Sequence, residues 1–177
     1  MANPTMTLIG SPIVVGSGGA SSIDFTSIPS TYTDLIIKVS ARTTRSLFYD
    51  NLTMTFNNIS SGYQTLRLTD NQSSGTSSDN LTGLSYFYVG EIDGANATSN
   101  TFSNIEIYVP NYLSSNPKSV SDDNVMENNS SQVYIGLHAH LWNYSGNPAI
   151  NRITFASDSG SSFVQYSTFT LYGINNS

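Results

Sequence analysis

The sequence predicts an all-β protein, a two-sheet antiparallel β-sandwich of jelly-roll type, and three observations lead to this prediction. Apolar and polar residues alternate with a period of two along most of the chain, as they do in strands that bury one face. Ser, Thr and Asn, which favour turns, caps and strand faces over helix interiors, make up 67 of the 177 residues. Charged residues make up only 10% of the chain, and no segment has a convincing helical period, so a helical bundle is excluded.

The length suits one compact domain, which we expect to span 1–177 with about nine or ten strands. Two strands are expected at 6–15 and 22–28, joined by a Gly/Ser-rich hairpin loop at 16–22. The clearest alternation follows in 35–42, where every second residue is apolar. The amino-terminal part therefore already predicts strands rather than a linker.

The middle of the chain continues the pattern. Alternation recurs in 52–57, and Leu66 and Leu68 extend it up to a polar stretch at 69–80, which we predict to be a long exposed loop. A further strand is expected in 84–91, where three aromatic residues follow one another.

The carboxy-terminal part contains four more alternating segments. The strand at 105–109 should end at Pro110, because proline has no backbone N–H to donate to a neighbouring strand. Residues 111–129 are predicted to be a second loop region. The remaining strands are expected at 133–142, 153–155 and 163–174.

Within 133–142, one face carries aliphatic residues and the other carries aromatic and histidine residues. The aliphatic positions are Ile135, Leu137, Ala139 and Leu141. The other face, extended by a tyrosine just beyond the strand, is of the kind that packs against a neighbouring subunit or, as an alternative, stacks on sugars. Its candidate contact residues are Tyr134, His138, His140, Trp142 and Tyr144.

Charge and composition exclude several functions. The net charge is −6, and the six basic residues are scattered, so a nucleic-acid surface, which needs clustered Lys or Arg, is not expected. Cysteine is absent, which excludes disulfides and thiolate metal sites. No segment approaches the ~20 apolar residues of a membrane span, and residues 1–10 lack the pattern of a signal peptide, so neither is expected.

Catalytic motifs are weak. With 30 serines and two histidines, a serine near a histidine is expected by chance, and no Gly-x-Ser-x-Gly motif occurs. The acidic pairs Glu91 with Asp93 and Asp122 with Asp123 could serve glycoside hydrolysis, but we expect them to be solvated loop acids. The sequence therefore predicts that the protein is not an enzyme.

Metal binding rests on few residues. His138 and His140 project from the same face of a strand and could present two imidazoles to one metal. The sequence places no third ligand near them, so a polar strand face is favoured, although a three-fold axis could collect such pairs from separate subunits. Calcium ligands at Asp70-Asn71 or Asp122-Asp123-Asn124 lack the ordered Asp-x-Asp-x-Asp-Gly loop. No metal or other cofactor is therefore expected.

Three segments resemble small β-rich virion proteins of tailed bacteriophages: Ile28–Arg42, Asp50–Asn57 and Ser167–Ile174. The resemblance implies a structural role in the particle and carries over no catalytic residue. Decoration proteins and fibre heads share these patterns. The chain lacks collagen-like or β-helical repeats and any shaft segment, which favours a compact head module or a capsid-surface protein over a long tail fibre.

The resemblance and the composition together predict a decoration, or cement, protein made in the host cytoplasm and located on the capsid surface of the virion. It would form a homotrimer and bridge neighbouring major capsid proteins, stabilising the shell by binding only its assembled form. Residues 1–15 are the expected anchoring arm, and the loops at 69–80 and 111–129 would face solvent. The candidate contact residues of the arm are Met6, Leu8, Ile9, Ile13 and Val15.

The main alternative is a receptor-binding head on a tail or head fibre that recognises host-surface glycan. This alternative requires a shallow aromatic groove, with Tyr63, Tyr112, Trp142 and Tyr144 as its candidates. A free carbohydrate-binding module or lectin is a weaker hypothesis, and a hydrolase is the weakest.

Overall fold

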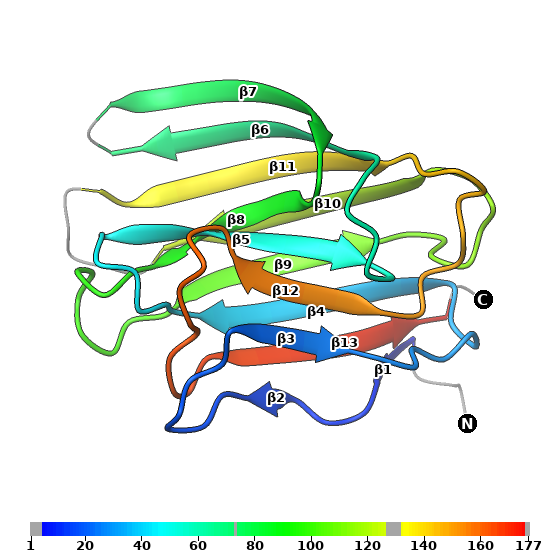
Figure 1. Ribbon diagram of the computed structural model, residues 1–177, viewed down its shortest axis with the longest axis horizontal. Coiled ribbons are helices and arrows are strands. Elements are labelled where there is room, and N and C mark those ends of the chain that lie inside the picture. Colours follow the sequence, from blue (N-terminus) through cyan, green and yellow to red (C-terminus); the bar gives the residue numbers. More distant parts are fainter. Residues whose placement is uncertain (1–4, 73, 127–131, 176–177) are drawn as a thin grey trace.

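The computed structural model describes residues 5–72, 74–126 and 132–175, and over these ranges it contains strands and no helix. The strands form two antiparallel sheets packed face to face, so the predicted all-β sandwich is confirmed (Figure 1). Thirteen strands occur in the described residues, more than the nine or ten expected. The jelly-roll type stays a prediction. None of these ranges contains a helix long and apolar enough to cross a membrane.

The larger sheet has nine strands. They are β1 (Met6–Leu8), β2 (Ile13–Val14), β4 (Asp34–Ala41), β6 (Tyr63–Asn71), β7 (Gly75–Leu84), β9 (Ser103–Val109), β10 (Lys118–Val125), β11 (Tyr134–Trp142) and β13 (Thr168–Ile174). Their spatial order is β1-β13-β4-β9-β10-β11-β6-β7, and β2 also pairs with β13.

The smaller sheet has four strands, in the order β3-β12-β5-β8. They are β3 (Ser22–Phe25), β5 (Tyr49–Phe56), β8 (Phe87–Asp93) and β12 (Ile153–Ser157). Its edge strand β8 contacts β6, β9, β10 and β11, whereas β7 forms the free edge of the larger sheet beyond it (Figure 1). The smaller sheet therefore encloses the inner face of β10, β11 and much of β6, but leaves β7 largely exposed.

An aromatic cluster fills the space between the sheets near β8. Phe56, Tyr63, Phe87 and Trp142 have no exposed surface, and the rings of Tyr63 and Phe87 meet edge to face at 4.8 Å. The Tyr63 hydroxyl accepts the Phe56 N–H at 2.8 Å and donates to the Ile59 carbonyl at 2.9 Å. Burial raises the pKa of Tyr63 to about 12, so the hydroxyl stays protonated at neutral pH.

Both predicted loop regions contain strands, which corrects the expectation for 69–80 and for 111–129. The first is a hairpin of β6 and β7, and it is polar because β7 is mostly exposed on both faces. The second contains β10, whose buried positions include Lys118, Asp122 and Asn124. Hydrophobic alternation could not reveal a strand that buries polar side chains.

The amino-terminal segment also differs from expectation. The strand expected at 6–15 is two short strands, β1 and β2, which both pair with β13. Pro12 lies between them and has no N–H to continue the ladder. Residues 16–22 are not a hairpin loop, because β2 lies in the larger sheet and β3 pairs with β12 in the smaller one. This connection therefore crosses between the sheets.

A buried arginine holds the loop that joins β8 to β9. The Arg42 guanidinium donates to the carbonyls of Ala95, Ala97 and Thr98 at 3.1, 3.0 and 2.5 Å, and to Thr101 O at 3.3 Å. The planar fork of arginine suits several carbonyls at once.

We expect Arg42→Met to lower the free energy of unfolding by about 2–3 kcal/mol, because buried carbonyls would lose their donors. The control is Lys38→Met, which removes an exposed ion pair with Glu106 and should change stability by less than about 1 kcal/mol. Urea unfolding of the three proteins measures both values. Equal losses in the two variants would show that the Arg42 contacts add nothing to the fold.

Candidate functional site

The candidate site lies on three neighbouring strands, β10, β11 and β6. His138 on β11 is paired with Asp122 on β10 and with Arg67 on β6. In the adjacent register position of β11, Leu137 lies between Asp123 and Leu68. Because successive side chains of a strand point to opposite faces, the two sets lie on opposite sides of the sheet.

The two faces of β11 are inverted relative to the sequence prediction. His138, His140 and Trp142 point inward and are buried, so they do not form the predicted contact surface. The physical reason is aromatic packing across the sandwich: the ring centroids of His140 and Phe87 are 4.8 Å apart, and Trp142 also packs on an aromatic ring of the smaller sheet.

The two tyrosines of the predicted contact surface are half-buried. Tyr134 packs against Tyr49 at 4.6 Å, and burial raises its pKa to about 12. Tyr144 stacks on Trp142 at 5.8 Å. The aromatic groove required for glycan recognition is not formed, because Tyr63, Tyr112 and Trp142 have no exposed surface.

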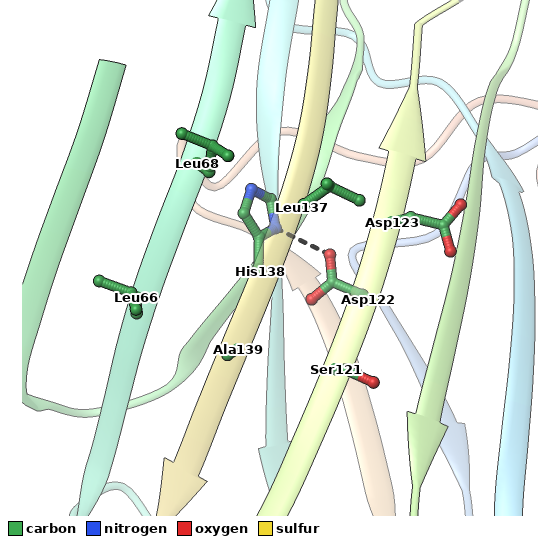
Figure 2. Close-up of a pocket in the computed structure, with 8 residues that line it drawn as sticks. All are labelled: Leu66, Leu68, Ser121, Asp122, Asp123, Leu137, His138 and Ala139. Carbon is green, nitrogen blue, oxygen red and sulfur yellow. Dashed lines mark hydrogen bonds and ion pairs between the residues drawn. The ribbon is translucent and has the colours of Figure 1, made fainter. Parts of the chain in front are cut away.

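Asp122, His138 and His140 form a buried group that we call the Asp-His-His cluster. His138 Nδ1 lies 2.8 Å from Asp122 Oδ1, and His140 Nε2 contacts Asp122 Oδ2 (Figure 2 shows the first contact). The Thr65 hydroxyl lies 2.9 Å from His140 Nδ1 and fixes the orientation of that ring. None of the three side chains is exposed. Asp122 is therefore a third side chain of a ligand type beside the two histidines, which the sequence did not place there.

A second acidic group faces the cluster from the smaller sheet. Glu91 on β8 lies 3.6 Å from Arg67 Nη1, and Arg67 Nη2 also donates to Asp79 at 2.8 Å. Burial raises the pKa of Glu91, and the nearby Arg67 guanidinium opposes this rise only in part. Glu91 is thus a buried strand residue and not the solvated loop acid that was expected.

The other acidic residues named from the sequence are distributed over both sides of the larger sheet and over the smaller sheet. Asp122 and Asn124 point inward while Asp123 points outward, so Asp122-Asp123-Asn124 cannot surround one calcium ion. Asp93 is also buried on β8, which corrects its expected solvation. Asp70 accepts a hydrogen bond from Thr76 across the β6–β7 hairpin at 2.8 Å.

The outward side of the same strands carries large aliphatic side chains, which we call the aliphatic face. Leu137, Leu66 and Ile135 are 58%, 55% and 52% exposed. A shallow groove of about 390 Å³ crosses this face, with Leu66, Leu68 and Leu137 among its lining residues (Figure 2). The full set is Leu66, Leu68, Val125, Ile135, Leu137 and Leu141.

The predicted anchoring residues divide into two groups. Ile9, Ile13 and Val15 pack against the core of the chain itself, so they are not available to a partner in this fold. Met6 and Leu8 on β1 are exposed at 38% and 42%. The first four residues of the expected arm lie outside the described residues.

Comparisons with known proteins give no family. No protein-family model matches the chain, and no curated protein matches it. Among solved structures, one described as an engineered GH43 glycoside hydrolase with endo-xylanase and exo-arabinofuranosidase activity has a TM-score of 0.30 and 9% identity, over 97% of this chain and 36% of that chain. A structure of infectious bursal disease virus, Gx strain, has a TM-score of 0.11 and 16% identity, over 96% of this chain and 38% of that chain. The chain thus spans little more than a third of either structure, and the scores carry no functional argument.

A glycine in β11 makes room for the cluster. A Cβ atom added at Gly136 would lie 2.1 Å from Asn124 Oδ1 and 2.7 Å from His138 Nε2. We expect Gly136→Ala to lower the free energy of unfolding by about 1–3 kcal/mol, because one of the two buried side chains must move. Gly18→Ala is the control, because a Cβ there meets nothing within 4 Å. Chemical denaturation measures both, and an unchanged Gly136→Ala variant would contradict the packing described.

The raised pKa of Glu91 predicts a pH dependence. In the unfolded chain the carboxyl titrates near 4.5, and in the folded chain it titrates at higher pH. The folded state therefore favours the protonated form, and the wild type loses stability as pH rises from the unfolded pKa through the folded one. Glutamine is neutral throughout, so Glu91→Gln should gain stability relative to the wild type over this window.

Urea unfolding of both proteins between about pH 4 and pH 7, with a chelator present, measures this difference. Titrating groups distant from Glu91 are common to the two proteins and cancel in the comparison, whereas groups that interact with Glu91, such as Asp122, contribute to the difference. The same dependence of the free energy of unfolding on pH in both proteins would show that the pKa of Glu91 is not raised in the folded state.

Proposed function

We propose that this protein is a non-enzymatic structural protein that decorates an assembled protein shell, as a cement protein on the capsid of a tailed bacteriophage. The aliphatic face is the observation that carries this proposal. Six large aliphatic side chains are exposed on the outer side of β6, β10 and β11, all in the same sheet. Contiguous apolar surface of this kind marks protein interaction sites, because its contact with water is unfavourable.

The surroundings of this face indicate the chemistry of its partner. Asp123 lies beside Leu137 on the outer side, and the neighbouring Glu106 on β9 is ion-paired with the exposed Lys38. The chain as a whole carries a net charge of −6. A suitable partner therefore presents an apolar surface with Lys or Arg at its margin, and the charge disfavours a second copy of this chain at the same place. In the proposal, this partner is the major capsid protein.

The buried state of the ionisable groups supports a non-enzymatic role. The His138 and His140 side chains have no exposed surface, and both contact Asp122. Asp50 and Glu91 are also buried, at 0% and 3% exposure. General acid–base catalysis requires such groups to reach a substrate, which buried side chains do not do in this fold.

The homotrimer is proposed to form through another surface. β1 is the terminal strand of the larger sheet, so one of its edges is available for strand addition. Met6 and Leu8 are exposed on this strand, and a neighbouring copy that adds a strand there would cover them.

The decisive experiment uses capsids that lack this protein. We expect the wild type to bind them to saturation in sedimentation and to raise their melting temperature, because a ligand of the assembled state alone stabilises that state. The double variant Leu66→Ser, Leu137→Ser should bind roughly 10–100-fold more weakly, because each leucine is a little over half exposed, and together they can newly bury about the area of one leucine, worth roughly 1.5–3 kcal/mol. Its own melting temperature should stay close to that of the wild type, because both side chains are exposed.

The matched control is Met6→Ser, Leu8→Ser, which removes exposed apolar side chains from the edge strand instead. Loss of capsid binding only in this control would move the docking surface to the anchoring arm. Absence of capsid binding by the wild type, together with retention on host polysaccharide, would overturn the proposal in favour of a receptor-binding head.

A further inference from the structure

The Asp-His-His cluster has the composition and spacing of a metal site. One ligand atom from each of Asp122, His138 and His140 lies within 4.8 Å of the others, and the nitrogens that face Asp122 are His138 Nδ1 and His140 Nε2. Ligand atoms that share one Zn²⁺ at about 2.0–2.2 Å lie about 3–4 Å apart, so small rotations of the side chains would admit an ion. Imidazole nitrogen and carboxylate oxygen are ordinary zinc ligands, whereas calcium requires six or more oxygen ligands.

The polar atoms around His138 also favour a metal at its Nδ1 atom. His138 Nε2 and Asn124 Oδ1 are both buried without a hydrogen-bond partner, and both approach the Cβ position of Gly136. The Asn124 amide is oriented by its Nδ2 group, which donates to the Glu91 carbonyl at 3.3 Å. Asn124 Oδ1 can only accept, so it matches a His138 ring that carries its proton on Nε2. A neutral ring with that proton has a free lone pair at Nδ1, which faces Asp122.

The ring of His140 also has one nitrogen facing Asp122 and an oxygen atom beside the other nitrogen. Its Nε2 atom faces Asp122, and its Nδ1 atom lies 2.9 Å from the Thr65 hydroxyl, whose oxygen can accept a hydrogen bond from a ring N–H. Metal-binding histidines typically donate their second ring N–H to an oxygen atom, which fixes the tautomer. Each imidazole of the cluster therefore has an oxygen acceptor beside the nitrogen that does not face the carboxylate.

The buried charges fit a divalent ion. Two carboxylates, Asp122 and Glu91, are enclosed between the sheets, and Arg67 divides its charge between Glu91 and Asp79. Uncompensated buried charge is costly, and Arg67 already faces Glu91, so a dication at the cluster would balance the charge of Asp122.

We propose that Asp122, His138 Nδ1 and His140 Nε2 bind one divalent transition metal ion, of which Zn²⁺ is the best match. The ion joins β10 to β11 from the inside of the sandwich and stabilises the register of these strands. This inference goes beyond the proposed function and does not rest on it, because it concerns the inner side of the sheet and no partner protein.

The first test uses the full chain without a histidine tag, stripped with a chelator and dialysed. Added Co²⁺ should give the visible absorption of a nitrogen- and oxygen-liganded ion in a stoichiometric titration, and Zn²⁺ should displace it. Excess Zn²⁺ should raise the melting temperature by about 5–10 °C, as expected when the folded state alone binds the ion. Elemental analysis of protein purified without chelator gives the bound ion directly.

The second test compares Asp122→Asn and His140→Gln with Asp123→Asn. Asp123 is the next residue on β10 but points to the outer side, so it is a matched control for charge and position. The first two variants should lose the Co²⁺ absorption and the Zn²⁺-dependent shift, and the control should keep both.

Three outcomes would overturn the proposal. A wild-type chain that neither absorbs with Co²⁺ nor gains stability with Zn²⁺ would show that the cluster is held by hydrogen bonds alone, with His138 as an imidazolium. This result does not depend on whether any variant folds. Equal loss of binding in Asp123→Asn and Asp122→Asn would place the ion on the outer face. Unchanged binding in both His140→Gln and Asp122→Asn would place it elsewhere on the chain.

Discussion

The pairing register of β6, β11 and β10 determines what this protein places inside and outside its sandwich. Tyr63 lies opposite Trp142, and Asp122 lies opposite His138. Side chains alternate between the faces of a sheet, so a shift by one residue would exchange every inner and outer position of β11. Tyr63 and Trp142 each bury about 150–250 Å² in this register. This burial determines which residues of β11 face the interior. The Asp-His-His cluster and the aliphatic face both result from this pairing.

The smaller sheet makes the polar interior possible. β8 encloses the inner side of β10 and β11 and supplies Phe87 against His140 and Glu91 near Arg67. Buried polar groups are tolerated only where they are hydrogen-bonded or charge-balanced. Asp122 meets this requirement through two imidazoles, and His140 meets it through Thr65.

The fold class and most strands could be predicted from alternation, whereas the side of the sheet on which each residue lies could not. Alternation in β11 separates Leu137 from His138, but it gives no information on which of the two faces the interior. The usual assumption that aliphatic residues are inside fails here because Trp142 is in phase with the histidines. The partnership of Asp122 with His138 depends on which strands are neighbours, and local sequence does not contain that information. Similarly, β10 was not predicted as a strand, because its buried positions include the polar residues Lys118 and Asn124 and therefore do not alternate with apolar residues.

This register has an energetic consequence for the outer side. Aliphatic side chains such as Leu66 and Leu137 contribute little to folding while they stay in water, and the aromatic residues prevent the chain from turning them inward. Only a partner can remove them from water. Because they project from strands whose backbone groups are already paired within the sheet, the partner has to pack against side chains and cannot bind by adding a strand there. The geometry therefore suits a broad, preformed apolar surface better than an extended peptide.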